Sequence, residues 1–404
     1  MRKYVYPRFE AELRYRYRIA LSTFWAIPAT FIMRVIRPLV AIRICGIRSD
    51  RIGHFVADIA EHIGRENFKP SRTFNFYYLR GPISNNQWEL MAKRSSLRVL
   101  GNWLRYLDDW NRIIPGGILH AISSSMTESR DLEGLFRKFD CAIEFLPEET
   151  SKCQQWLESK GWTKGEPFVV LLVRDSAYLN QDHSNYDWNY HSYRDSDIRT
   201  YLTAMEWLAS QGVWVLRMGK SMALPFQSKS HKIIDYAFDS EKSDLLDIWL
   251  FANCTGVIST ATGLDQLAMI YQIPQLYVNA MPLGSIHTWS RMIWVPKNLR
   301  WGKSKQPLSI SQYLEHSYYQ LNEYASAGIE IIDLSSDEIL MVVKEFWWKI
   351  CGSWDPTEVD AEKQKRFWEI FKSWAQYDKM HGVHHPNAVV GSDWLLSIDN
   401  EALN

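Results

Sequence analysis

The chain has 404 residues, of which 46% are hydrophobic and 23% are charged, which is typical of a globular protein with a sizeable core and two or three domains. Its formal net charge is zero, which excludes a protein that binds nucleic acid through an overall basic surface, so nucleic acid is not an expected partner. The five cysteines are scattered and form no CxxC pair, which favours a reducing compartment and argues against a cysteine-held metal.

The N-terminal segment is locally basic and aromatic. Residues 1–18 carry six basic and two acidic side chains interleaved with Tyr and Phe, and the apolar run IALSTFWAIPATFIM follows. Those 15 residues, with Pro28 inside them, fall short of the roughly 20 needed to span a bilayer. Two interpretations stay open: a basic helix that lies on an anionic membrane surface through residues 1–43, or an amphipathic helix packed on its own domain.

Residues 40–160 alternate between expected strands and helices. VAIRICGI (40–47) and TFNFYYL (73–79) are expected to be strands, and the helical stretch FVADIAEHIG lies between them. CAIEFL (141–146) is a further candidate strand. Pro147 can open the next helix, because its missing N–H would be unpaired there anyway. This pattern predicts a first Rossmann-like domain.

The alternation is clearer after GWTKGEP (161–167), a turn-rich break that predicts the boundary between the two halves. FVVLLV (168–173) is wholly apolar, as expected for a strand covered on both faces of a sheet. Strands that alternate with helices predict a parallel sheet. The later elements expected here are strands at VWVLRMG, KIIDYA, GVIST and PQLYVN, and helices at 195–212, SDLLDIWLFANC and TGLDQLAMIYQ.

The predicted fold class is therefore α/β: two facing Rossmann-like domains and a closing C-terminal helix at 357–379. Sheets of this kind bind ligands outside the carboxyl ends of their strands, so the residues directly after each strand are candidates for a site. The predicted organisation is a basic and aromatic helical segment over 1–39, Rossmann-like domains over 40–160 and 161–355, and a C-terminal helix and tail over 356–404.

Each strand of the second half ends in a polar or glycine-bearing corner, and corners that converge on one sheet edge predict a binding site. Arg174 and Arg217 can neutralise a diphosphate, since a planar guanidinium pairs two phosphate oxygens at once. The alternative is that Arg174 pairs only with Asp175 or Asp195 as a scaffold salt bridge. The candidate residues at these corners are Arg174, Asp175, Arg217, Gly219, Asp235, Thr262, Gly263 and Asn279.

A second anion-binding device is predicted at TATGLDQLA. Thr262 and Gly263 lie where a helix is expected to begin, so free backbone N–H groups and the positive end of the helix dipole would face the ligand. Asp235, Ser243 and Asp244 are candidates for binding a ribose, although the first turn of a helix also favours a carboxylate such as Asp244 without any ligand.

The connection SAYLNQDHSNYDWNYHSYRDSD is long for a link between a strand and a helix, and it shows no apolar period. Long connections at the carboxyl edge of a sheet tend to be functional. Tyr178, His191, Tyr193 and Arg194 are candidate contacts to sugar hydroxyls or to a base. The alternative for each of them is an ordinary polar surface residue.

In the first half, IRSDRIGHFVADI (47–59) is the informative stretch. Gly53 would permit a tight turn from strand to helix, and His54 would then stand at the rim of the site, with Arg51 and Gly53 on the acceptor side. Histidine titrates near pH 6.5, close to ideal for a general base, so His54 is a candidate catalytic residue. The alternative is a capping or hydrogen-bonded loop histidine.

The run from VRDSAYLN through HSYRDSDIRTYLTAMEWL and GVISTATGLDQLA to IPQLYVN resembles a family of bacterial glycosyltransferases found among surface-polysaccharide genes. VRDSAYL with HSYRDSDI is also similar to the strand–arginine motif of fucosyltransferases that use GDP-fucose. That likeness implies that Arg174 contacts the donor diphosphate, with Thr262 and Gly263 at the donor-phosphate corner. RSDRIGH is similar to the start of heptosyltransferases, where an aspartate acts near the acceptor hydroxyl and this chain has His54 instead.

These resemblances imply the two-Rossmann GT-B architecture, which requires no metal or other cofactor because protein groups neutralise the leaving diphosphate. The predicted function is transfer of a sugar from a nucleotide-sugar donor to a glycan or lipid-linked acceptor. The expected location is the cytoplasm or the inner face of the cytoplasmic membrane. The alternatives are a two-domain nucleotide-sugar epimerase and a non-catalytic sugar-nucleotide-binding scaffold protein of a polysaccharide assembly complex. A dinucleotide oxidoreductase is disfavoured, because no GxGxxG follows a strand.

Overall fold

The computed structural model describes residues 6–175 and 189–398, and it divides into two compact units. Both units are built on parallel sheets with helices, so the predicted α/β class is confirmed. The division precedes helix α6 (Pro147–Ser159), which the sequence places in the first half. Unit 1 comprises Met1–Ser129 with Phe139–Glu144, and unit 2 comprises Arg130–Lys138 with Phe145–Asn404.

The sheet of unit 1 has three parallel strands in the order β1-β2-β3. β1 and β2 pair along their full lengths, from Ala41 opposite Thr73 to Arg48 opposite Arg80. The predicted strand at 141–146 is not formed. The elements of unit 1 besides α1 are β1 (Ala41–Arg48), α2 (Ile52–Glu66), β2 (Thr73–Arg80), α3 (Asn86–Arg94), β3 (Arg98–Val99), α4 (Trp103–Ile113) and η1 (Gly117–His120).

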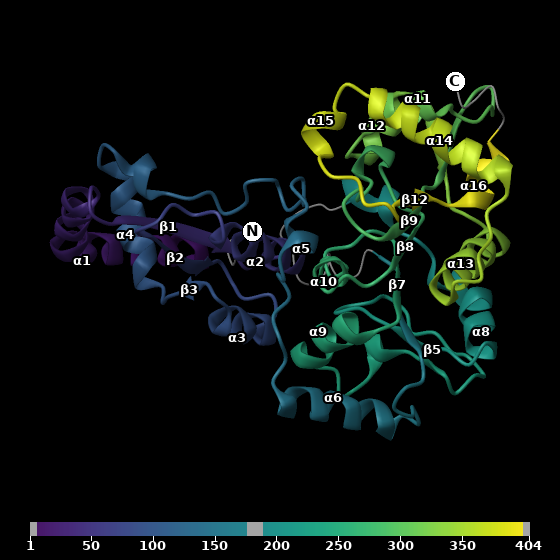
Figure 1. The fold of residues 1–404 in the computed structure, drawn as a ribbon, viewed down its shortest axis with the longest axis horizontal. Coiled ribbons are helices and arrows are strands. Elements are labelled where there is room, and N and C mark those ends of the chain that lie inside the picture. Colours follow the sequence, from purple (N-terminus) through teal and green to yellow (C-terminus); the bar gives the residue numbers. More distant parts are fainter. Residues whose placement is uncertain (1–5, 176–188, 399–404) are drawn as a thin grey trace. The chain divides into compact units, whose positions relative to one another are not determined.

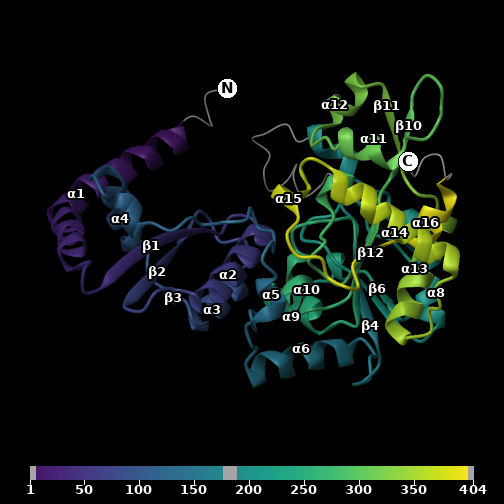
Figure 2. The same cartoon turned by 45° about the horizontal axis from the view of Figure 1, so that its top comes forward.

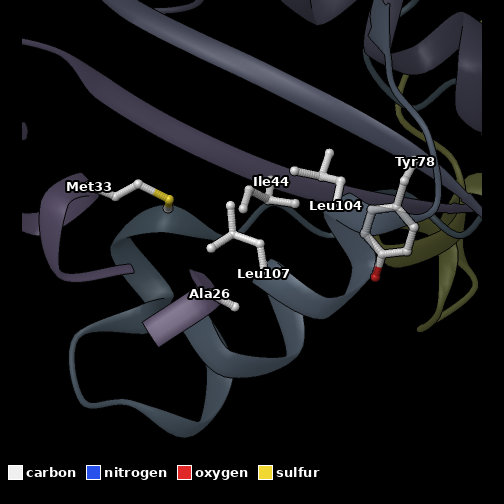
Figure 3. Close-up of a cluster of buried hydrophobic side chains, with 6 residues drawn as sticks. All are labelled: Ala26, Met33, Ile44, Tyr78, Leu104 and Leu107. Atoms are coloured by element: carbon white, nitrogen blue, oxygen red, sulfur yellow. The ribbon is translucent and has the colours of Figure 1, made fainter. Parts of the chain in front are cut away.

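Helix α1 (Tyr6–Ile36) lies within the helical segment predicted at 1–39 and continues through Pro28. Its part Leu13–Ile36 is long and apolar enough to cross a membrane by length and composition, which corrects the expectation of a run too short to do so. One face of α1 packs on α4, and the indole of Trp110 donates to the hydroxyl of Ser22. Figure 3 shows the buried cluster at this contact, formed by Ala26, Met33, Ile44, Tyr78, Leu104 and Leu107.

The sheet of unit 2 has seven parallel strands in the order β12-β9-β8-β7-β4-β5-β6. The central strands β4, β7 and β8 are buried along their whole length, as predicted for β4 from its wholly apolar sequence. Figure 1 shows β7, β8 and β9 next to one another in this unit. The strands are β4 (Phe168–Leu172), β5 (Trp214–Arg217), β6 (Ile233–Ile234), β7 (Gly256–Ser259), β8 (Gln275–Val278), β9 (Met292–Val295) and β12 (Val389–Val390).

The C-terminal helix predicted at 357–379 forms as α14 (Glu358–Ser373), which starts with a capping box at Thr357, and the short α15 follows it. α14 packs beside α16 within unit 2 (Figure 2). The sequence did not predict the antiparallel pair of β10 (Asn298–Trp301) and β11 (Ile329–Ile332).

The remaining elements of unit 2 are α-helices and short 3₁₀ turns. They are α5 (Leu135–Lys138), η2 (Asn189–Arg194), η3 (Ile198–Tyr201), α8 (Leu202–Ser210), η4 (Tyr236–Phe238), α9 (Asp244–Asn253), α10 (Gln266–Ile270), η5 (Leu283–Ser285), α11 (Ile310–Glu315), α12 (Leu321–Ser326), α13 (Ser336–Cys351), α15 (Tyr377–Met380) and α16 (Ser392–Ser397).

Candidate functional site

The strand order of unit 2 reverses between β4 and β7. The chain runs outward from β4 to β5 and β6, and then returns to the other side of β4 to form β7, β8 and β9. In open α/β sheets, ligands bind in the crevice outside the carboxyl ends of the strands at such a switch point. The backbone N–H of Arg174, just after β4, donates to Oγ1 of Thr260, just after β7, at 2.9 Å. The segments that follow the two strands are therefore joined at the switch point.

Arg174 lies at this switch point with its side chain 15% exposed. Its Nε donates to Oδ1 of Asp195 at 3.0 Å, which is the one hydrogen bond of the guanidinium among the described residues. Burial lowers the pKa of Arg174, and the charge of Arg194 lowers it further. The salt bridge between Arg174 and Asp195, which the sequence offered as an alternative to phosphate binding, is therefore formed. It engages one of the five N–H donors of a guanidinium.

Lys297 holds the segment that carries Asp195. It follows β9, is buried, donates from Nζ to the backbone carbonyl of Asp195 at 2.6 Å, and pairs with Asp333 at 2.7 Å. Lys297 was not among the candidates predicted from the sequence, although its position shortly after the apolar run MIWV matches that of the other candidates. Lys297 adds a third cation to the edge that carries Arg174 and Arg194.

The corner after β7 contains several buried polar groups. Nη2 of Arg194 donates to the backbone carbonyl of Ala261, a residue with a left-handed φ of 60°. Asp265 is fully buried and accepts from the hydroxyl of Ser259 at 2.8 Å and from the N–H of Thr262 at 2.7 Å. Burial raises the pKa of Asp265 to about 7.

In the part of the chain that the structure describes, four buried atoms of this corner have no hydrogen-bond partner. Buried polar atoms are nearly always hydrogen-bonded, so a group of exceptions at a switch point indicates a place where a polar ligand fits. The unpartnered atoms are Nε of Arg194, Oγ1 of Thr262, Oδ1 of Asp265 and Oε1 of Gln266.

The predicted helix start at Thr262 and Gly263 needs correction. α10 begins only at Gln266 and has five residues, and the N–H of Thr262 is bonded to the carboxylate of Asp265. Gly263 is exposed in the turn before the helix. The corner is therefore a turn closed by a carboxylate, and the helix-dipole device predicted from the sequence does not form at these two residues.

Arg217 lies away from the solvent, which corrects its predicted role as a phosphate ligand. Its side chain is 1% exposed and lies 5.6 and 5.5 Å from the rings of Phe226 and Phe238. Nη1 donates to the carbonyl of Leu224 at 2.7 Å and to both oxygens of Asp235 at 3.3 and 3.2 Å. Buried Arg217 and partly buried Asp235 form a pair that joins β5 to the segment after β6, so neither is placed to contact a diphosphate or a ribose.

Two further candidates of unit 2 are buried. Asn279 is fully buried with a φ of 55°, and its side chain accepts from the N–H of Leu334 at 2.8 Å. Tyr193 is 3% exposed against the ring of Tyr324 at 5.6 Å, and burial raises its pKa to about 12. Burial and contacts within unit 2 therefore account for Asn279 and Tyr193 without a ligand.

The other candidates of unit 2 mostly support local structure. Oδ2 of Asp175 accepts from the N–H of Ala223 at 2.9 Å, and the carbonyl of Gly219, where φ is 153°, accepts from Lys242 at 3.2 Å. Ser243 is the N-cap of α9, and Asp244 lies in the first turn of that helix. Tyr178 and the side chain of His191 lie outside the described residues.

In unit 1, His54 lies in the first turn of α2, directly beyond the carboxyl end of β1. The helix begins at Ile52, so Gly53 is a helical residue and not part of the tight turn that the sequence predicted, and Arg51 occupies the N-cap position without a side-chain cap. Nδ1 of His54 is 2.7 Å from the hydroxyl of Ser129. Burial and then the charges of Arg48 and Arg51 lower the pKa of His54. The imidazole is therefore neutral at pH 7, as a general base must be.

No family model matches the sequence, and no curated protein matches it. In three dimensions the chain is similar to a glycosyl transferase of family 9 from Veillonella parvula, with a TM-score of 0.41 and 10% identity over 64% of this chain and 86% of that one. It is similar to ADP-heptose lps heptosyltransferase II from E. coli, with a TM-score of 0.39 and 10% identity over 63% and 90% of the two chains. A third similar structure is the iron-containing dodecameric glycosyltransferase TibC from enterotoxigenic E. coli, with a TM-score of 0.33 and 11% identity over 60% of each chain.

A heptosyltransferase is thus among the structures to which the chain is similar. The resemblance to fucosyltransferases that use GDP-fucose stays a prediction. With TM-scores below 0.5 and identities near 10%, residue roles do not transfer from these structures to this chain.

Proposed function

We propose that the protein is a nucleotide-sugar-dependent glycosyltransferase whose donor diphosphate binds to unit 2 at the switch point between β4 and β7. The observation that carries this proposal is the group of cations and unpartnered buried polar atoms around Arg174 at that sheet edge. Phosphate oxygens are acceptors that match guanidinium N–H groups and a threonine hydroxyl.

The chemistry follows from the charge of the leaving group. When the bond between the anomeric carbon and the diphosphate oxygen breaks, negative charge grows on the nucleotide diphosphate. Arg174 stabilises that charge with its terminal N–H groups while Asp195 fixes the orientation of its Nε. Fixed charges of this kind act strongly because they need no rearrangement during the reaction.

Unit 1 activates the acceptor in this proposal. The hydroxyl oxygen of the acceptor forms the new bond to the anomeric carbon, and its proton passes to Nε2 of His54. The lowered pKa of His54 supports this role because it keeps the imidazole unprotonated at neutral pH. The proposed acceptor is a glycan or lipid-linked glycan of bacterial surface-polysaccharide biosynthesis.

The outer face of α1 supports a membrane-bound acceptor. Its exposed apolar residues recur every three or four positions, so they form one stripe along the helix. Arg14, Arg16 and Arg18 are exposed near the N-terminal end of this stripe, and residues 13–36 contain no acidic side chain. We therefore propose that this stripe lies on the anionic inner face of the cytoplasmic membrane. Its residues are Leu13, Tyr17, Leu21, Phe24, Phe31, Ile32 and Val35.

The deciding experiment is a thermal-shift screen of the purified protein against UDP, GDP, ADP, CMP and dTDP, with and without EDTA. A ligand that binds only the folded form raises the melting temperature. A shift that persists in EDTA supports the proposal, as does release of the same nucleotide diphosphate from its sugar conjugate in the presence of an acceptor extract. Absence of a shift with every nucleotide contradicts the donor site.

The same samples separate the two alternative functions. A sugar nucleotide that binds but never turns over points to a scaffold protein. Exchange of solvent deuterium into the sugar of the donor without transfer points to an epimerase.

A further inference from the structure

Three side chains of unit 1 form a hydrogen-bonded chain that begins at His54. Nδ1 of His54 lies 2.7 Å from Oγ of Ser129, and this hydroxyl donates to Oδ1 of Asp58 at 2.9 Å. His54 and Asp58 are four residues apart on α2, so they lie on the same face of the helix, and Ser129 bridges them from a loop 75 residues further along the chain. Asp58 is 1% exposed and lies behind the histidine.

The direction of these hydrogen bonds follows from the number of donors. A serine hydroxyl has one hydrogen, and an ionised carboxylate only accepts. Asp58 also receives a hydrogen bond from the hydroxyl of Ser125, so two hydroxyl groups point their hydrogens at it. Because the hydrogen of Ser129 goes to Asp58, Oγ offers only a lone pair to His54. Nδ1 of His54 must then carry a hydrogen, and Nε2 keeps its lone pair.

We propose that Asp58 is a positioning residue that acts through the Ser129 hydroxyl to hold His54 as the Nδ1–H tautomer, so that Nε2 is free to accept the proton of the acceptor hydroxyl. This inference rests on the proposed function only in giving His54 the role of base. Two of its members, Asp58 and Ser129, were not among the residues that the sequence singled out.

The loop that carries Ser129 is held in a demanding conformation. Glu128 and Ser129 have φ values of 54° and 62°, in the left-handed region that non-glycine residues rarely adopt. The N–H of Ser129 donates to Oγ of Ser125 at 2.8 Å, and the N–H of Met126 donates to buried Glu61 at 3.1 Å. Conformations of this kind persist when surrounding contacts enforce them, and they cluster at functional sites. Here one of these contacts lies within the loop and the other comes from Glu61, which lies on α2 three residues after Asp58.

The hydrogen-bonded chain of His54, Ser129 and Asp58 also responds to pH in a defined direction. Burial raises the pKa of Asp58 to about 7; Ser129, Ser125 and Arg48 lower this pKa, and the charge of Glu61 raises it. A protonated carboxyl can donate to Ser129, which can then donate to Nδ1 of His54 and leave the hydrogen on Nε2. The base form of His54 is therefore present above about pH 7 and is lost as the pH falls through that value. The other charges that face His54 are Arg48, Arg51 and Asp50.

The test reads the tautomer of His54 directly, without substrate. Imidazole ¹⁵N chemical shifts of the full chain are recorded at pH 8, and the His54→Gln variant identifies the signals of this residue. We expect a protonated Nδ1 and an unprotonated Nε2 in the native protein. In Ser129→Gly, which removes the hydroxyl at a position where glycine tolerates the left-handed φ, the Nδ1–H form should lose its dominance. Circular dichroism checks that the variant is folded.

Ser123→Ala is the matched control, because it removes from the same loop a hydroxyl that donates to the backbone carbonyl of Ser125 instead of to Asp58 or His54. Its His54 tautomer should match that of the native protein. A native protein with its hydrogen on Nε2 at pH 8 overturns the inference. So does a Ser123→Ala variant whose tautomer changes as much as that of Ser129→Gly, since that would make loop order the cause.

Activity gives a second readout that separates this inference from the proposed function. Where transfer is measurable, Ser129→Gly should lower kcat/KM by about 10- to 100-fold, a part of the 10²–10⁴ that a general base supplies, with donor affinity unchanged. The pH near 7 below which kcat/KM falls should also shift in this variant, because protonation of Asp58 no longer changes the tautomer of His54. If the protein transfers no sugar but shows the expected tautomers, the proposed function is wrong and the inference about His54 still holds. If Ser129→Gly keeps full activity, the inference is wrong and the proposed function still holds.

Discussion

The carboxyl edges of the two parallel sheets carry opposite chemistry. At the edge of unit 1, the base His54 is backed by a hydroxyl and a buried carboxylate in one continuous chain. At the edge of unit 2, Arg174, Arg194 and Lys297 bring three positive charges together, and neighbouring buried polar atoms have no partner in the described structure.

The difference shows what each edge is prepared for. A general base needs one defined protonation state before its substrate arrives, so its own hydrogen bonds are completed within the protein. A binding edge for an anion needs donors that remain available, so some of its hydrogen bonds are completed only by the ligand. The contrast predicts that mutations in unit 1 change turnover and mutations in unit 2 change nucleotide binding.

The largest expected effect is that of His54→Ala on turnover. Removal of the base should lower kcat by about 10²–10⁴-fold, while the dissociation constant for the nucleotide diphosphate stays within twofold of the native value. Turnover is measured by nucleotide release and affinity by calorimetry. Equal losses in both would break the division between the two edges and make His54 a structural residue.

Arg174→Ala should weaken nucleotide binding as well as turnover. Loss of the guanidinium should weaken nucleotide binding sharply and lower kcat by about 10²–10³-fold, as expected when a donor to developing charge is removed. Arg199→Ala is the matched control, because Arg199 is an exposed arginine of the same region that pairs with Asp197. Unchanged nucleotide affinity in Arg174→Ala would refute the phosphate assignment.

The contrast between Arg174 and Arg217 also shows how far the sequence could lead. Both arginines end or follow an apolar strand, and both were predicted to bind phosphate. Arg217 is the last residue of β5, and the aromatic rings that enclose it come from segments 9 and 21 residues further along the chain. Position after a strand identifies the edge of the sheet, but tertiary packing decides whether a side chain at that edge reaches the solvent.

The same limit applies to the fold. The wholly apolar run of β4 predicted a strand covered on both faces, and the alternation of strands with helices predicted the parallel sheet. The pair of β10 and β11 was missed because its partners lie about thirty residues apart. The apolar length of α1 was underestimated because only an uninterrupted run of 15 residues was counted. Ser129 could not be found, since nothing in its local sequence reveals a contact to His54.

Arg217→Ala should affect stability and leave the donor edge intact. Arg217 is buried and Asp235 is partly buried, so removal of the arginine takes a hydrogen-bonded partner from the carboxylate and should lower the free energy of unfolding by about 1–3 kcal/mol. Urea denaturation measures this loss. The folded fraction should keep native affinity for the nucleotide. A loss of affinity without a loss of stability would show that Arg217 contributes to nucleotide binding.

The smallest expected effects are on membrane association, which should belong to unit 1 alone. Phe24 is 77% exposed on the stripe of α1, so Phe24→Ser should weaken binding to vesicles that contain anionic lipid by about tenfold, since burial of a phenylalanine contributes about 1.5–3 kcal/mol.

Arg18→Gln should weaken binding to anionic vesicles by about fivefold at low salt and leave binding to neutral vesicles unchanged, because one arginine near an anionic surface contributes about 1 kcal/mol. Leu90→Ser is the matched control, as Leu90 is 54% exposed on α3. If Phe24→Ser instead converts a dimer into a monomer in sedimentation and leaves vesicle binding unchanged, the stripe is covered by a second copy of the chain, and the case for a lipid-linked acceptor loses its support.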